Sequence, residues 1–290
     1  MRKGALVAQE ALNENITVNV SNTEALTPAQ ITQKADDLGI TKTEMSFARS
    51  FMLSLMAGAF ISMGAMFFCL VVGDPNLPFA IQRVLGGFLF CLGLILVVVA
   101  GAELFTGNTM IVMTAASKRI KWSAVWKNWI VVFVGNFIGA LIIVGLVFLS
   151  EMPSMNGGQI GQTMVSVAAG KMHAGWLALF AKGIMCNFLV CLGVWMAYAS
   201  RTVADKILAV LFPITAFVAC GFEHCVANMF FLPMGALLAS FGIAPAGIDP
   251  ATVNMMGALY NWSATVPGNI IGGAIFVGLA YWFIYRKKQN

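Results

Sequence analysis

The sequence predicts an all-α integral membrane protein whose spans form two inverted three-helix repeats. Its 290 residues are 59% hydrophobic and 10% charged, with a mean hydropathy of +0.84; about 20 apolar residues cross a bilayer as a helix. A polar string occurs twice at one spacing, as Gly101, Glu103 and Asn108, then as Gly221, Glu223 and Asn228. Polar groups are unfavourable inside a membrane, so a repeated set indicates function.

Six apolar segments are expected to cross the membrane. They lie near residues 47–72, 84–117, 124–149, 173–199, 203–240 and 261–285. The second and fifth are too long for one crossing, and each contains the polar string near its middle. We interpret each as two half-helices joined by irregular backbone. Lipid cannot satisfy such backbone, which should therefore line a cavity enclosed by protein.

The chain is expected to divide into a cytoplasmic N-terminal segment, a six-span channel domain and a basic cytoplasmic tail, over residues 1–46, 47–285 and 286–290. In the first part, Thr27, Pro28 and Gly39 frame a short amphipathic helix. Packing at the membrane interface is favoured for it, while docking on a neighbour or closing the cytoplasmic mouth stay open. The first 20 residues lack the continuous apolar stretch of a secretory signal.

Basic residues concentrate in the loops on one side of the predicted bundle. With the N-terminus inside, only Arg83 and Lys171 fall outside, whereas the remaining loop lysines and arginines face the cytoplasm. This asymmetry predicts that both termini are cytoplasmic. It also accounts for the net charge of +5 without nucleic acid.

Further matches support an internal duplication. Gly135, Asn136 and Gly139 reappear as Gly268, Asn269 and Gly272, and Gly58 and Ser62 resemble Gly183 and Asn187. An odd number of spans per repeat inverts the second copy, so the two broken spans should meet near the membrane midplane. The glycines are interpreted as close helix packing, with Asn136 and Asn269 hydrogen-bonding between helices.

The polar residues at the breaks have a structural interpretation. Glu103 and Glu223 are expected to cap backbone N–H groups exposed at the half-helix ends. Asn108 and Asn228 can also satisfy freed backbone groups. Asn228 lies one turn beyond His224, however, and could instead turn its amide toward the cavity.

His224 is the strongest functional candidate. It is one of two histidines and interrupts the repeat, because Leu104 stands at the matching position of the first copy. Histidine titrates near neutral pH and can offer a proton or a positive charge to an anion inside the membrane. A hydrogen-bonded core histidine is the alternative.

Bulky apolar side chains surround the breaks and could gate a pore by excluding water, although core packing is the favoured interpretation. They are Phe90, Leu94, Leu104, Phe105 and Phe217. Lys182, within the fourth span, must face a cavity, form a pair or extend to the interface. The cysteines lie in apolar spans without a CxxC pair, so we expect small core residues, no metal site and no cofactor.

Several strings resemble the formate/nitrite transporter family from about residue 28 onward. They are GAELFT at 101–106, KGIMCN at 182–187, GFEH and ANM between 221 and 229, and GNIIGG at 268–273. The resemblance implies an aquaporin-like fold of six spans, a homopentamer with one pore per protomer, and passage of small monovalent anions of weak acids. It also implies a plasma (inner) membrane location and no enzymatic activity.

The resemblance also assigns roles by position. It makes His224 the central pore histidine and places Thr106 opposite it. Phe90, Leu94, Phe217 and Val190 would narrow the pore, Asn187 and Asn228 would be polar pore residues, and Lys171 would attract anions at the outer vestibule. Formate is the favoured substrate, with nitrite or hydrosulfide as alternatives because Lys182 and Cys225 depart from the pattern of some formate channels.

Two other functions are less compatible with the sequence. A neutral-solute pore of the water or glycerol type also has paired broken spans, but this chain lacks the two Asn-Pro-Ala strings of such pores. An intramembrane hydrolase could use Glu223, His224 and a cysteine. The sequence contains no HExxH motif, and adjacent residues on a helix point apart.

Overall fold

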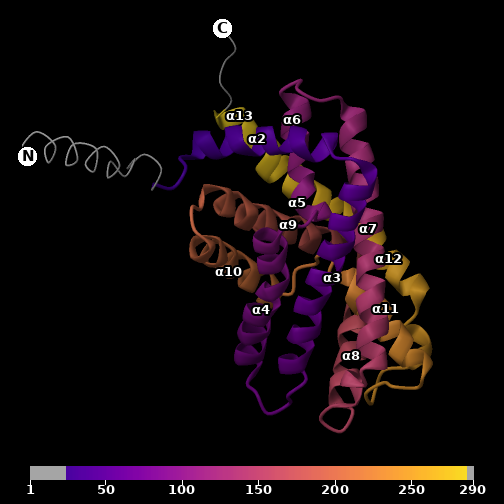
Figure 1. Cartoon of the computed structure of the whole chain (residues 1–290). Coiled ribbons are helices and arrows are strands. Elements are labelled where there is room, and N and C mark those ends of the chain that lie inside the picture. Colours follow the sequence, from indigo (N-terminus) through magenta and orange to yellow (C-terminus); the bar gives the residue numbers. More distant parts are fainter. Residues whose placement is uncertain (1–23, 286–290) are drawn as a thin grey trace, which may run out of the picture.

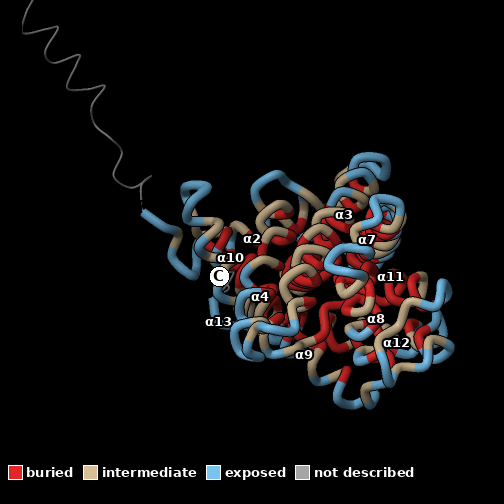
Figure 2. The backbone as a smooth tube through the Cα atoms, turned by 90° about the horizontal axis from the view of Figure 1, so that it is seen from below, coloured by how far each residue is buried: buried red, intermediate tan, exposed pale blue. Residues whose placement is uncertain are grey.

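A computed structural model describes residues 24–285, so the predicted basic tail and the first 23 residues lie outside the described part. This part is built of helices (Figure 1). Five helices are long and apolar enough to cross a membrane: Phe47–Val72 (α3), Phe79–Gly101 (α4 and its π-helical end), Trp122–Leu149 (α7), Trp176–Ala199 (α9) and Met255–Tyr285 (α12 to α13). The predicted fifth span is divided into two shorter helices, described below. Buried residues occupy the middle of the bundle (Figure 2).

The first break lies within the predicted polar string. Helix α4 (Phe79–Leu96) continues as a π-helical segment to Gly101, the chain is extended at Ala102, and helices resume at Phe105. The resumed chain comprises α5 (Phe105–Asn108), a 3-10 turn (Thr109–Ile111) and α6 (Val112–Ala116). Gly101 has a φ of +86°, a conformation that favours glycine, which explains the residue type at the break.

The second break has the same local cause. Helix α10 (Val203–Ala219) ends before Gly221, whose φ is +71°, and α11 (Asn228–Ser240) begins seven residues after that glycine. The predicted irregular backbone at both polar strings is therefore present. Each break also contains its glutamate, at 103 and at 223.

Each repeat begins with a helix that precedes its first spanning helix. Helix α2 (Pro28–Glu44) precedes α3, and α8 (Gln159–Met172), which was not predicted, precedes α9 in the same way. Thr27 caps α2 as expected, with a reciprocal bond to Gln30. Gly39 does not end the helix; it lies inside α2 in contact with Thr114, which leaves no room for a Cβ.

Helix α2 docks on the bundle at the end that also carries α6 and α13 (Figure 1). The Nζ of Lys34 donates to the Tyr198 carbonyl at 2.7 Å. The guanidinium of Arg119, after α6, contacts the carboxylates of Asp36 and Asp37 at 2.9 and 2.7 Å. Among the alternatives left open for this helix, the structure therefore shows docking on neighbouring helices of the same chain.

The structural alignment of the first span with the fourth differs from the one expected from the sequence. The Glu103 N–H donates to the Leu53 carbonyl at 3.2 Å, and the Glu223 N–H donates to the Lys182 carbonyl at 3.3 Å. Leu53 thus corresponds to Lys182, which pairs Gly58 with Asn187. The expected match of Gly58 with Gly183 is wrong by four residues, about one helical turn. A one-turn slip keeps the same helix face, so small residues alone could not reveal it.

Close packing of α7 on α3, and of α12 with the π-helical segment Ile271–Leu279 on α9, agrees with the interpretation of the glycines. A Cβ at Gly139 would collide with the Leu55 carbonyl oxygen, and one at Gly272 with the Ile184 carbonyl oxygen. The cysteines are buried with one exception, Cys220, which is exposed beside the second break. The expectation that all of them are core residues is wrong at that position.

Candidate functional site

The two breaks meet at a hydrogen bond between Thr106 and His224. The Thr106 Oγ1 and the His224 Nε2 are 2.9 Å apart, and both side chains are buried. Thr106 lies in the first turn of α5 and His224 lies between α10 and α11. Residues 118 positions apart thus come together because the repeats insert their broken spans toward one another.

The hydrogen bonds of His224 define its tautomer. The Ala227 N–H donates to Nδ1 at 3.0 Å, so Nδ1 is an acceptor and carries no proton. The proton of a neutral imidazole is then on Nε2, which donates to the Thr106 Oγ1. This leaves the Thr106 hydroxyl hydrogen available to a third group, such as an anion oxygen.

A row of aromatic rings continues from His224 toward α4. The Phe217 ring lies 5.8 Å from the imidazole at an interplanar angle of 31°, and Phe90 packs edge-on against Phe217 at 5.7 Å. Leu94, one turn beyond Phe90, and Val190 on α9 are also buried. The structure therefore brings Phe90 and Phe217 together beside the histidine.

The two apolar residues predicted inside the first break have different surroundings. Phe105 packs against Trp129 and Phe133 of α7, with ring centroids 6.2 and 5.1 Å away. Its ring thus turns to the α7 side of the break, rather than toward Phe90 or Phe217. Leu104, the positional counterpart of His224, is buried.

Asn187 supports Thr106 from α9. Its Nδ2 donates to the carbonyl oxygens of Thr106 and Asn269, at 3.1 and 2.7 Å, and to the Thr109 Oγ1 at 3.1 Å. The side chain therefore holds the backbone on which Thr106 is carried. In this arrangement Asn187 affects the site indirectly, by positioning Thr106.

Glu103 belongs to a buried cluster in the first repeat. Its carboxylate accepts from the Lys42 Nζ at 2.7 Å and from the Asn108 Nδ2 at 2.7 Å. Lys42 also donates to the Asn108 Oδ1 at 2.8 Å, and Asn108 donates to the Asn128 Oδ1 at 2.9 Å. We call Lys42, Glu103, Asn108 and Asn128 the first cluster.

The second repeat reproduces this arrangement as the second cluster, Lys171, Glu223, Asn228 and Asn261. Lys171 bonds Glu223 at 3.0 Å, and Asn228 donates to Glu223 at 2.7 Å and to Asn261 at 2.8 Å. Two bonds differ: the buried Asn228 Oδ1 has no hydrogen-bond partner among the described residues, whereas the Asn108 Oδ1 accepts from Lys42, and the Asn261 Nδ2 also donates to Glu223 at 3.3 Å. Lys171 instead places its Nζ 5.4 Å from the Phe231 ring centroid.

These clusters change the interpretation of two predicted groups. Both glutamate carboxylates accept from lysine and asparagine side chains, so the expected capping of backbone N–H groups by Glu103 and Glu223 is wrong. Lys171 is not free in a vestibule either, since its side chain is 16% exposed and ion-paired. Asn228 directs its amide to Glu223 and Asn261, and Asn108 directs its own to Glu103 and Asn128, so the expected pairing of these asparagines with freed backbone groups is wrong.

Backbone groups at the breaks are satisfied by the two repeated asparagines. The Asn136 Oδ1 accepts from the Phe105 N–H at 2.9 Å, while its Nδ2 donates to the Ser54 and Glu103 carbonyls. Asn269 makes the equivalent bonds at the second break: its Oδ1 accepts from the Cys225 N–H at 2.8 Å, and its Nδ2 donates to the Gly183 and Glu223 carbonyls. Hydrogen bonding between helices was predicted for both residues, and it is present.

Lys42 and two Asn-Trp pairs were missed, and a signal for the pairs exists in the sequence. An Asn-Trp pair, at 128–129 and 261–262, stands seven residues before the Gly of each GNxxG string. The Trp129 indole donates to the Asn108 carbonyl and the Trp262 indole to the Cys225 carbonyl, at 3.0 and 3.2 Å. A longer comparison of the third and sixth spans would have identified them.

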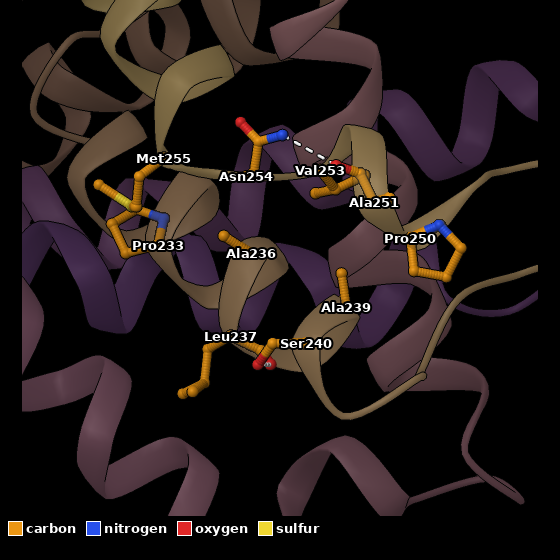
Figure 3. Close-up of a pocket in the computed structure, with 10 residues that line it drawn as sticks. All are labelled: Pro233, Ala236, Leu237, Ala239, Ser240, Pro250, Ala251, Val253, Asn254 and Met255. Carbon is orange, nitrogen blue, oxygen red and sulfur yellow. Dashed lines mark hydrogen bonds between the residues drawn. The ribbon is translucent and has the colours of Figure 1, made fainter.

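Nothing in the geometry supports hydrolysis. Glu223 and the His224 imidazole have separate partners, and within residues 24–285 no group of three or more His, Cys, Asp or Glu side chains could hold a metal ion. A cavity of about 530 Å³ lies apart from the breaks (Figure 3), between α11 and the segment before α12. It is lined by Pro233, Ala236, Leu237, Ala239, Ser240, Pro250, Ala251, Val253, Asn254 and Met255.

Comparisons with known proteins agree with this architecture. Residues 29–283 match the formate/nitrite transporter family. The chain is 39% identical to the formate channel FocA of Escherichia coli K12 over 92% of its length and 97% of the relative. It is 38% identical to FocA of Haemophilus influenzae, over 88% and 93%. A solved structure described as a pentameric formate channel with formate bound has a TM-score of 0.75 and 37% identity, covering 83% of this chain and 98% of that one. The chain therefore belongs to the formate/nitrite transporter family of membrane proteins.

Proposed function

We propose that this protein is a channel for small monovalent anions of weak acids, with formate as its main substrate. The named formate channels among its relatives support the substrate. The pentameric neighbour supports a homopentamer with one pore in each protomer. We also propose a plasma (inner) membrane location with both termini in the cytoplasm, on the distribution of basic residues.

The observation that carries the proposal is the buried contact between Thr106 and His224. It places two donors, the imidazole Nε2–H and the threonine hydroxyl, where the broken spans meet. An oxyanion that replaces this mutual bond can accept from both groups. Donors fixed in a medium of low dielectric stabilise an anion more strongly than they would in water.

Apolar rings beside this pair account for selectivity by charge. An anion leaving the two donors meets the rings of Phe90 and Phe217, which offer no hydrogen bond in place of its hydration. Passage therefore favours the neutral acid, or an anion that moves together with a proton. This step makes transport depend on pH.

The imidazole acts as a donor in this mechanism and not as the source of the proton. An imidazolium needs a hydrogen on Nδ1, which would displace the bond from the Ala227 N–H. The resting neutral ring can orient the anion through Nε2–H while the proton enters with the substrate from solution. Proton donation by a transient imidazolium is the competing form of the proposal.

A liposome experiment tests the proposal. Uptake of formate, nitrite, hydrosulfide and glycerol is measured as the external pH is lowered, for the wild type, His224→Leu and His224→Asn. His173→Asn, at the exposed histidine that follows α8, is the control. A hydrogen bond to a charged group contributes about 1.5–3 kcal/mol, so His224→Leu should reduce formate uptake about 10- to 100-fold. His224→Asn should keep pH-dependent uptake because an amide still donates, and the control should resemble the wild type.

Each outcome has a defined meaning. Loss of pH dependence in His224→Asn would favour proton donation by the imidazole. A preference for nitrite or hydrosulfide would change the substrate. Glycerol uptake without anion uptake would overturn the mechanism.

A further inference from the structure

Arg83 occupies the same face of α4 as the aromatic row. Residues 83, 90 and 94 follow the i, i+7, i+11 spacing of one helix face, so Arg83 lies about 10 Å along the axis from Phe90. It is close to the start of α4, at the end of the bundle opposite α2 and α13 (Figure 1). This is the extracellular mouth in the proposed topology.

The guanidinium of Arg83 is fixed beside the second break. Its Nε donates to the Ala219 carbonyl at 3.0 Å and its Nη2 to the Val218 carbonyl at 2.7 Å, immediately after Phe217. It also lies 5.8 Å from the centroid of the Phe68 ring. These bonds occupy part of the guanidinium, which has five N–H donors, so further donors remain for an anion.

The charge of Arg83 has no carboxylate counterpart. Among the residues that the structure describes, the ion pairs take up Lys42, Lys171 and Arg119, and none includes Arg83. The acidic residue nearest in the chain, Asp74, directs its carboxylate to Asn76. The guanidinium is opposed by the negative end of the α10 dipole, equivalent to about half a charge, and by the face of the Phe68 ring.

We propose that Arg83, rather than Lys171, is the cation that gathers substrate anions at the mouth of the pore. This inference rests on the proposed function. Lys171 forms an ion pair with the buried Glu223, which cancels most of its field, whereas Arg83 is fixed, half-buried and without a carboxylate partner among the described residues. A cation at a mouth with apolar walls raises the local concentration of anions and their rate of entry.

Transport kinetics supply the first test, with Arg83→Gln compared against Arg83→Lys. Loss of the charge should raise the KM for external formate about three- to tenfold and weaken its dependence on ionic strength. Lysine keeps the charge but loses the bidentate geometry, so Arg83→Lys should stay close to the wild type. Lys127→Gln, which removes an exposed charge from the opposite end, is the matched control.

Cys220 provides a readout that does not depend on transport. It follows Ala219, to which Arg83 is bonded, and is exposed while the other cysteines are buried. In detergent-solubilised protein, a cation nearby should accelerate labelling by an anionic methanethiosulfonate relative to a cationic one. The ratio of the two rates should fall about three- to tenfold in Arg83→Gln and stay near the wild-type ratio in Arg83→Lys and Lys127→Gln.

The two measurements separate this inference from the proposed function. If the wild type fails to transport any anion, the proposed function fails, whereas the thiol ratio still reports the cation. If formate is transported but Arg83→Gln changes neither the KM nor the ratio, Arg83 does not gather anions. If Arg83→Gln and Arg83→Lys raise the KM equally, without a change in its salt dependence, Arg83 acts only by bonding the carbonyls at the end of α10, and the inference is overturned.

Discussion

Replacing Lys171 with methionine should destabilise the protein by about 3 kcal/mol, because it leaves a buried carboxylate without its cation. The Glu223 side chain is 5% exposed and accepts from the Lys171 Nζ at 3.0 Å. Removing one partner of a buried pair costs about 3–5 kcal/mol. Asn228 and Asn261 still donate to Glu223 in the variant, which places the expected value at the lower end.

A double-mutant cycle measures this pair. Unfolding of detergent-solubilised protein is followed for the wild type, Lys171→Met, Glu223→Gln and the double variant. In the double variant no charge is left, and the new amide can donate to the Asn228 Oδ1, which otherwise has no partner among the described residues. The double variant should therefore recover much of the loss, with a coupling energy of about 2 kcal/mol or more.

The same cycle on Lys42 and Glu103 is the matched comparison, since this pair is closer, at 2.7 Å, and Lys42 also bonds Asn108. Its coupling should be at least as large. Additive effects, with a coupling below about 0.5 kcal/mol in either cluster, would refute the argument that these lysines compensate buried carboxylates.

Three further predictions concern packing, the breaks and pH. Gly139→Ala should cost about 1–3 kcal/mol because its Cβ meets the Leu55 carbonyl, whereas Gly145→Ala, with open space around it, should be neutral in the same unfolding assay. Asn269→Leu should cost about 3 kcal/mol or more, because three buried backbone groups lose their partner; an effect below about 1 kcal/mol would contradict that role. Burial, and after it the charges of Lys206 and Arg201, lowers the pKa of Lys34 in the folded protein. The charged ammonium therefore destabilises the docked α2 fully below the folded-state pKa, and this destabilisation disappears as the pH rises toward the ordinary lysine pKa of 10.5. Proteolytic release of α2 should thus slow as the pH rises through that window, and Lys34→Gln should flatten the profile.

Sequence patterning located the breaks because a local cause determines them. Gly101 and Gly221 take positive φ values that favour glycine, and the polar string around each is visible without any tertiary information. The Thr27 cap of α2 is equally local. The all-α membrane fold and the family followed from the apolar spans and the repeated strings.

Some errors arose where an apolar window was taken as the whole element. Helix α4 begins at Phe79 instead of 84, because its polar residues Gln82 and Arg83 find hydrogen-bond partners. Helix α12 begins at Met255 instead of 261, because the Asn254 side chain caps its first turn. Helix α8 was missed because its small and polar residues resemble a loop. Its similarity to α2 lies in its place before the spanning helix and in its lysine, and not in a shared string.

The sequence by itself determined the membrane class, the inverted duplication, both breaks and the choice of His224 as the exceptional residue. Only the tertiary structure decided the partners: Thr106 for His224, Lys42 and Lys171 for the two glutamates, and the α7 aromatics for Phe105. The physical reason is range. Backbone conformation and hydropathy depend on neighbours in the chain, whereas these contacts join residues 28 to 118 positions apart and depend on how the helices and repeats pack against each other.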